Sequence, residues 1–552
     1  MPWTQNYFAV GNSLALTALA GAIPIFYFFW ALAIKKMKGH IAGLTTLALS
    51  IIDVIIVFKM PFGLAISATL LGIVNGLFPI LWIVITALFL YNLVVEAGQF
   101  DIIKNSIASI SPDRRLQTLL IAFSFGAFLE GAAGFGIPVA ITSALLIGLG
   151  FEPLYAAGLS LVANTAPVAF GGIGIPVVTM AGVTGLDSNL ISRAVVHQLP
   201  LIAIIVPFYL VILLAGWKGI KDVLPAILVN AFSFAILQWG TAMYLGANLP
   251  DIVASLGSLL ITALFLKAWK PKNIWRFPHE RDTAIIEHTK YSGAQIFKAW
   301  SPFVILTAMV GIWGTNGFKT WADKSHLYLL IKSWPGLDKL VYKTAPIVAK
   351  PAIYAANYRM DFVAAAGTAI LLTCILSMIV LQISPSRGLK VFGATFKQLI
   401  YPIITVSCVL GFAFIANYSG LSFTLALLLA KTGQAFPFFS PILGWFGVFL
   451  TGSDTSSNAL FGKLQQVTAT QLHINPLVTV AGNCSGGGVG KMISPQSIAV
   501  GAATTNMVGR EGEIFKFSLK HSVLFVCLLG VLVYLQAYVF PWMMPTISTV
   551  MH

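Results

Sequence analysis

Gly-Ala-Phe-Leu-Glu-Gly-Ala, residues 126–132, returns as Gly-Val-Phe-Leu-Thr-Gly-Ser at 447–453, about 320 residues later. The two copies continue alike, because Asn164 and Asn483 each precede a proline by twelve residues, with a glycine-rich run in between. These polar, glycine-rich stretches interrupt otherwise apolar sequence. Many transporters build a substrate site from such a pair of internal repeats. The sequence therefore predicts a duplicated membrane unit.

The composition is that of a polytopic helical membrane protein. Of the 552 residues, 58% are hydrophobic and 9% are charged, whereas soluble domains carry about 25% charged residues. Apolar runs of roughly 17 to 25 residues follow one another from residue 14 to residue 545, and each can cross a hydrocarbon core of about 30 Å. The net charge of +15 lies mostly in the short linkers between these runs. Basic residues in the short linkers follow the positive-inside rule of membrane proteins. This distribution argues against nucleic-acid binding.

Several functional classes lack support in the sequence. The four cysteines lie in apolar runs without metal or disulfide spacing, and no nucleotide-binding motif or metal cluster is present. We therefore expect no cofactor and no metal ion. No basic region precedes the first apolar run, so a removable signal peptide is not expected. A membrane-embedded enzyme would need a nucleophile beside a base, or a metal site, and neither is found.

The basic linkers predict an orientation. If the two motif stretches are re-entrant hairpins, 14 Lys and Arg residues share one side of the membrane, in linkers 35–38, 104–115, 217–222, 387–397 and 510–520. This excess predicts that these linkers are cytoplasmic and that the N-terminus lies outside. Seven spans separate the elbows at Gly98 and Gly420. Because seven is odd, the second copy is predicted to be inverted relative to the first.

The two hairpin tips, 129–138 and 450–459, are the predicted anion site. Glycines let the chain turn and let a ligand approach the backbone, and helix N-termini at such breaks attract anions. The expected donors are Gly131, Gly134, Ser453, Thr455, Ser456, Ser457 and Asn458. Packing of helices through small residues is the alternative explanation for the glycines.

Further polar residues accompany the tips. The second pair of breaks is preceded by Asn164 and Thr165 in the first copy and by Asn483 and Ser485 in the second. We expect Asn164 or Asn483 to bind a hydroxyl group of the substrate. Capping of freed backbone groups is the alternative role for these amides.

Three ionisable residues stand in apolar surroundings, where the default interpretation is functional. Lys491, placed in a glycine-rich break at 486–492, is expected to pair with a substrate carboxylate or with an acid. Glu130 and Asp454 are expected to carry a coupling proton, since burial favours the neutral form of a carboxyl group. A structural ion pair is the alternative.

At these motifs the chain resembles the lactate permease family. The resemblance runs nearly end to end and is carried by Gly-Gln-Phe-Asp-Ile-Ile (98–103), Phe-Leu-Glu-Gly-Ala-Ala-Gly-Phe-Gly (128–136), Asn-Thr-Ala-Pro-Val-Ala-Phe-Gly (164–171), Asn-Tyr-Ser-Gly-Leu-Ser (417–422), Thr-Gly-Ser-Asp-Thr-Ser-Ser-Asn-Ala-Leu-Phe (451–461) and Gly-Lys-Met-Ile-Ser-Pro-Gln-Ser-Ile-Ala (490–499). Two departures are Ile137, where a small residue is common, and Cys484, where Thr is common.

The resemblance implies proton-coupled symport of lactate (L and/or D) and glycolate, small 2-hydroxymonocarboxylates, across the bacterial inner or plasma membrane. Similarity to the broader ion-transporter superfamily implies an elevator with a scaffold and a moving transport domain, and a homodimer as a plausible assembly. A sodium-coupled carboxylate or dicarboxylate carrier of the same architecture is the alternative within transport. A channel is a third option.

Taken together, the predicted fold is an all-α polytopic membrane protein with about 12 to 14 transmembrane helices, inverted repeats, two re-entrant hairpins and two broken helices. The expected boundaries are 1–97 for N-terminal scaffold helices, 98–180 for transport repeat 1 (hairpin 116–150, broken helix 154–180), 181–417 for scaffold helices and linkers, 418–508 for transport repeat 2 (hairpin 437–470, broken helix 474–508), and 509–552 for the C-terminal helix.

Overall fold

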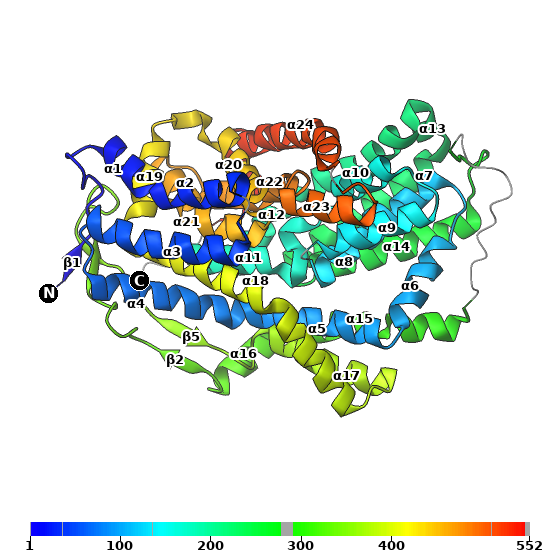
Figure 1. Ribbon diagram of the computed structural model, residues 1–552, viewed down its shortest axis with the longest axis horizontal. Helices are drawn as coiled ribbons and strands as arrows, with labels where there is room; N and C mark the ends of the chain where they lie inside the picture. Colours follow the sequence, from blue (N-terminus) through cyan, green and yellow to red (C-terminus); the bar gives the residue numbers. More distant parts are fainter. Residues whose placement is uncertain (1, 36, 135, 278–290, 509, 547–552) are drawn as a thin grey trace.

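The structure, a computed structural model, describes residues 2–35, 37–134, 136–277, 291–508 and 510–546. It is an elongated bundle of helices (Figure 1). Within the described residues, eight helices are long and apolar enough to cross a membrane, or nine if the bent pair α10–α11 counts as one span. The chain is therefore built as a multi-pass membrane protein. Residues 278–290, in the expected stretch of scaffold helices and linkers 181–417, lie outside the described residues.

The N-terminal helices pack against a long helix from the second half of the chain. These helices are α1 (Leu14–Gly21), α2 (Ile23–Phe29), α3 (Gly39–Ile56), α4 (Phe62–Asn75) and α5 (Trp82–Glu96). Helices α3 and α4 both contact α18 (Pro385–Ser419). At Gly72 of α4, a side chain would collide with the backbone carbonyl of Leu410 in α18, so this close helix approach requires glycine.

The first motif copy folds as a series of short helices. They are α6 (Gln99–Ala108), α7 (Arg114–Gln117), α8 (Gly126–Ala132), α9 (Ile137–Gly148), α10 (Pro153–Ala163), α11 (Gly171–Thr184) and α12 (Ser188–Val195). Helices α10 and α11 are bent by 62° at a short break. Left-handed backbone at Gly172, Ile173 and Gly174 extends the unwound region into the first turn of α11. This copy therefore has an interruption where the sequence predicts a broken helix.

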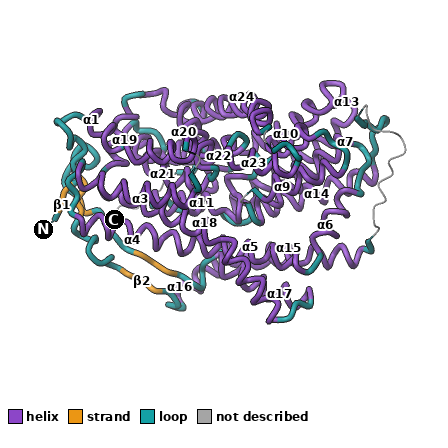
Figure 2. Tube along the Cα trace, viewed as in Figure 1, coloured by secondary structure: helices purple, strands orange, loops and turns teal. Residues whose placement is uncertain are grey.

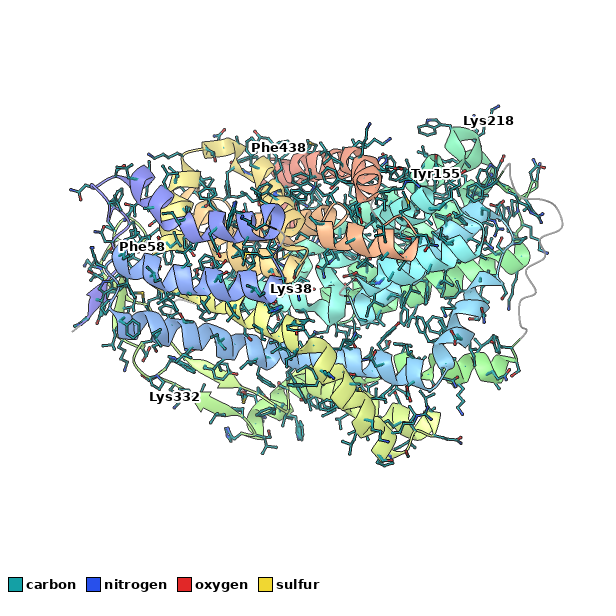
Figure 3. The ribbon with its side chains drawn as sticks, in the orientation of Figure 1. Lys38, Phe58, Tyr155, Lys218, Lys332 and Phe438 are labelled. Atoms are coloured by element: carbon teal, nitrogen blue, oxygen red, sulfur yellow. The ribbon has the colours of Figure 1, made fainter. Side chains whose placement is uncertain are left out.

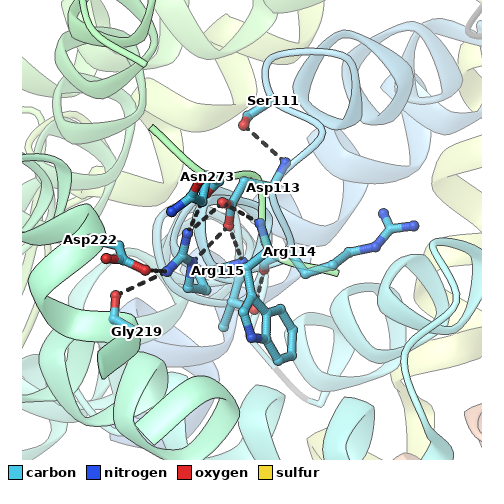
Figure 4. A network of polar contacts seen from close by, with 9 residues as sticks. Ser111, Asp113, Arg114, Arg115, Gly219, Asp222 and Asn273 are labelled. Carbon is cyan, nitrogen blue, oxygen red and sulfur yellow. Dashed lines mark hydrogen bonds and ion pairs between the residues drawn. The ribbon is translucent and has the colours of Figure 1, made fainter. Parts of the chain in front are cut away.

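The base of this copy is held by a buried arginine. Arg115 is fully buried and forms ion pairs with Asp113 at 2.8 Å and Asp222 at 3.0 Å. It also donates to the backbone carbonyls of Gly219 and Asn273 (Figure 4). Because these partners come from separate segments, Arg115 ties the start of the first motif to the bend of α13 and to the loop after α14.

The middle of the chain contains long helices and two small sheets. The helices are α13 (Leu199–Tyr244), α14 (Pro250–Ala268), α15 (Gly293–Gly314), α16 (Asn316–Lys324) and α17 (Ala366–Leu381). The strands are β1 (Trp3–Thr4), β2 (Leu329–Ile331), β3 (Val341–Lys343), β4 (Ala352–Ile353) and β5 (Tyr358–Met360), in the sheets β1-β3-β4 and β2-β5. Figure 2 shows β1 and β2 at the same end of the bundle. The segment 317–360 thus contains strands that pair with each other and with the N-terminal strand β1.

The second motif copy forms α19 (Leu421–Ala430), α20 (Phe436–Thr451), α21 (Asp454–Gln471), α22 (Pro476–Lys491) and α23 (Pro495–Thr504), and α24 (Glu511–Tyr538) follows. Helices α20, α22 and α24 lie side by side (Figure 1). Exposed lysines such as Lys218 and Lys332 project from the outside of the molecule (Figure 3).

The second interruption lies later than the sequence predicts. The run 486–490 was expected to be unwound, but it is helical, and α22 ends only at Lys491. The glycines serve helix packing instead: side chains at Gly486 and Gly490 would collide with the carbonyls of Pro441 and Trp445 in α20. The chain leaves the helix at 492–494, between α22 and α23.

The number of spans differs from the expected 12 to 14 for two structural reasons. The 46-residue helix α13 is counted once, although non-helical backbone at Gly216 and Val223 divides it into two helical segments. In addition, helices of the two motif copies such as α9, α20 and α22 have 12 to 16 residues. A helix needs about 20 residues to cross the hydrocarbon core of a membrane. The number of crossings stays a prediction.

Candidate functional site

A cavity of about 900 Å³ lies where the two motif copies meet. Its wall contains Glu130 and Gly134 from the first tip and Thr451 to Ser456 from the second. The break of the first copy adds Gly171 and Gly172, and the break of the second adds Lys491 and Gln496. Segments about 320 residues apart in the sequence therefore share one cavity.

The two expected acids are buried at this cavity, and each fits beside a glycine of another helix. Glu130 is 5% exposed and Asp454 is 4% exposed. A side chain at Gly171 would collide with the Glu130 carboxylate, and one at Gly487 of α22 would collide with Asp454. Glycine at these two positions therefore makes room for the acids.

The acids differ in their hydrogen bonds. Asn164 Nδ2 donates to Glu130 Oε2 at 3.0 Å. Within the described part of the chain, both carboxylate oxygens of Asp454 are buried without a hydrogen-bond partner. A buried, ionised carboxylate without donors is costly. Asp454 is therefore suited to bind a proton or a donor group from a ligand.

Lys491 is the cation of the site. It is 6% exposed and ends α22, and its ammonium donates to the backbone carbonyl of Gly452 in the second tip. Glu130 and Asp454 are its electrostatic partners. Because its hydrogen bond goes to a neutral carbonyl, the ammonium retains donors for an anion in the cavity.

Two helix N-termini open onto the same wall. Ser453 caps α21 by accepting a hydrogen bond from Ser456 N at 3.2 Å, and Ser494 caps α23 in the same way through Ser497 N. The cavity wall includes the first residues of both helices. Unpaired N–H groups and the partial positive charge of a helix N-terminus stabilise a carboxylate.

Half of the predicted site residues do not line the cavity. Those in its wall are Glu130, Gly134, Ser453, Asp454, Thr455, Ser456 and Lys491, whereas Gly131, Asn164, Thr165, Ser457, Asn458, Asn483 and Ser485 are not part of the wall. Several of the residues outside the wall form hydrogen bonds between helices. Asn483 donates to Asn458 Oδ1 at 2.8 Å, and Asn458 donates to the carbonyl of Pro176 at 3.1 Å, so this pair links the second copy to the first.

Sequence reasoning also missed a buried acid close to Glu130. Asp251, at the start of α14, is 1% exposed, and its Oδ1 accepts a hydrogen bond from Gln238 at 3.0 Å. It packs against Gly131, and Glu130 acts on it electrostatically. In the sequence, Asp251 is only an acid at the start of an apolar run. Acids are common at the ends of membrane spans, so this position does not indicate that Asp251 is buried near Glu130.

Comparison with known proteins decides the family. The family model described as L-lactate permease matches residues 17–540. The chain belongs to the L-lactate permease family. The permease is 51% identical to the glycolate permease GlcA of Escherichia coli K12, covering 98% of this chain and 99% of that protein. It is 50% identical to the L-lactate permease of the same organism, covering 98% of this chain and 100% of that protein.

The predicted resemblance is thus confirmed, and the permease is a membrane transporter, not an enzyme. Among solved structures it is similar to the efflux pump MtrF of Neisseria gonorrhoeae, at 15% identity, with 86% of this chain and 84% of that chain covered and a TM-score of 0.48.

Proposed function

We propose that this permease carries lactate (L and/or D) and glycolate together with protons across the bacterial inner or plasma membrane. The observation that supports the proposal most is the cavity in which Glu130, Asp454 and Lys491 meet two helix N-termini. Relatives that match nearly the whole chain are named as glycolate and L-lactate permeases, and these names suggest the substrate class.

A small carboxylate would bind at the second tip. Lys491 supplies the charge, and the N–H groups at the start of α21, with Thr455 and Ser456, supply further donors. A charge-assisted hydrogen bond contributes about 1.5 to 3 kcal/mol. That is enough for the lysine to dominate the affinity for a ligand as small as glycolate.

The buried charges support coupling to protons. With Glu130 and Asp454 ionised, Lys491 offsets the charge of only one of these two buried acids. Glu511 also lies in the wall, and a bound monocarboxylate adds further negative charge. Like charges in a desolvated site repel strongly. Protonation of one or both acids removes this penalty, so the proton and the anion favour each other's binding.

We also propose that the permease consists of two transport repeats and a scaffold, with the boundaries expected from the sequence. Residues 98–180 and 418–508 would form inverted transport repeats, each with a re-entrant hairpin and a broken helix, that move against the scaffold helices as an elevator. The cavity wall includes Met37 and Phe515, which lie in or beside linkers expected in the cytoplasm. With the N-terminus outside, the described conformation would therefore be open to the cytoplasm. A homodimer remains part of the proposal.

The test is uptake of radiolabelled L-lactate, D-lactate and glycolate by proteoliposomes that contain the purified permease. An imposed pH gradient, acidic outside, should drive accumulation above the external concentration without sodium. Accumulation that requires a sodium gradient and ignores the pH gradient would refute proton coupling. Absence of saturable uptake for all three acids would refute the proposed substrates.

A further inference from the structure

The amides expected to bind the substrate hydroxyl already form hydrogen bonds with other side chains of the protein. Asn164 donates to Glu130. Asn483 uses both ends of its amide, since it donates to Asn458 and its Oδ1 accepts from Gln465 at 3.2 Å. Neither residue is part of the cavity wall. A hydroxyl group in the cavity must therefore find another partner.

Gln496 is the one carboxamide among the described residues that line the cavity. It is exposed to the cavity, and its amide forms no hydrogen bond within the part of the chain that the structure describes. It stands in the first turn of α23, whose cap is Ser494. A free carboxamide offers both a donor and an acceptor.

The position of Gln496 fits a substrate held by Lys491. A side chain at Gly452 would collide with Gln496 Oε1, so the amide lies directly against this residue of the second tip. The carbonyl of the same Gly452 accepts the hydrogen bond from Lys491. The Gln496 amide and the Lys491 ammonium therefore lie on either side of Gly452. In a 2-hydroxy acid the carboxylate and the hydroxyl group are on adjacent carbons, so two neighbouring polar groups of the protein can bind them together.

We propose that Gln496 determines specificity by pairing its amide with the 2-hydroxyl group of the substrate while Lys491 holds the carboxylate. The proposal rests on the proposed transport of lactate and glycolate and identifies what separates these acids from propionate and acetate. Thr455, another residue of the cavity wall at the second tip, is assigned to the carboxylate end by the proposed function. A site built to bind a hydroxyl group rejects the analogue that lacks it, because its polar groups would then stay unpaired.

The experiment measures how strongly four unlabelled acids inhibit the counterflow of labelled lactate in proteoliposomes, with equal pH on both sides of the membrane. L-lactate is compared with propionate, and glycolate with acetate. Gln496→Met keeps the length of the side chain and removes its amide. We expect the inhibition constants of both hydroxy acids to rise about tenfold, the size of one to two net hydrogen bonds, while those of propionate and acetate stay unchanged. Thr455→Val is the matched comparison and should weaken all four acids alike.

Two results would overturn the inference. One is a Gln496→Met protein that keeps the wild-type preference for the hydroxy acids, and the other is an equal loss for all four acids. If Gln496→Met does not insert into the membrane, Gln496→Ala gives the same comparison. A wild-type protein that transports neither lactate nor glycolate would refute the proposed function instead, so the two failures are distinguishable.

Discussion

The substitution Lys491→Gln isolates the contribution of the cation to substrate binding. Glutamine can still donate to the carbonyl of Gly452, but it has no charge for the substrate carboxylate. The lost charge-assisted hydrogen bond is worth about 1.5 to 3 kcal/mol, which corresponds to a roughly 10- to 150-fold weaker affinity. The side chain is 6% exposed, so little screening by water reduces this figure.

The assay is the KM for labelled lactate in counterflow with equal pH on both sides, which separates affinity from coupling. Lys463→Gln is the matched control. Its ammonium also donates to a backbone carbonyl, that of Thr184 at 3.0 Å, but it does not line the cavity. The control should change KM less than threefold. A correctly folded Lys491→Gln protein with a KM within threefold of wild type would refute the assignment of the carboxylate to this lysine.

Three further predictions address coupling and stability. Asp454→Asn should abolish uphill uptake while leaving part of the exchange, and retained gradient-driven uptake in both this variant and Glu130→Gln would contradict the coupling assignment. Gly490→Ala should lower the thermal unfolding temperature because its methyl group meets backbone of α20, at a cost of about 1 to 3 kcal/mol. In contrast, Gly393→Ala in α18, where the added methyl group would meet no atom within 4 Å beyond the adjacent backbone of its own helix, should leave the unfolding temperature unchanged or raised. Arg115→Gln should destabilise the protein by about 3 to 5 kcal/mol, since the buried Asp113 loses its charged partner, and an unfolding temperature in detergent equal to wild type would be evidence against this role.

Several features could be predicted from the sequence because they follow from composition and spacing. The apolar runs and charged linkers indicate a multi-pass membrane protein, and residues from both similar motifs line one cavity. Glu130, Asp454 and Lys491 could be singled out because an ionisable residue in apolar sequence is expensive to bury. Their exact roles stay predictions.

Other features depend on partners that the sequence does not reveal. Asn164, Asn483 and Gln496 are similar as residue types, yet only Gln496 has a free amide at the cavity, because the other two find acceptors on neighbouring helices. Likewise, the glycines at 486–490 suggest unwinding when read alone. Their actual role, close packing of α22 on α20, depends on the opposing helix.

A structure of the permease in lipid nanodiscs with bound L-lactate would test the central claim most directly. We predict density for lactate between Lys491, the first turn of α21 and Gln496, with its carboxylate on the lysine. Density at another place in the molecule, or the same acid bound with Lys491 turned away from it, would contradict the account.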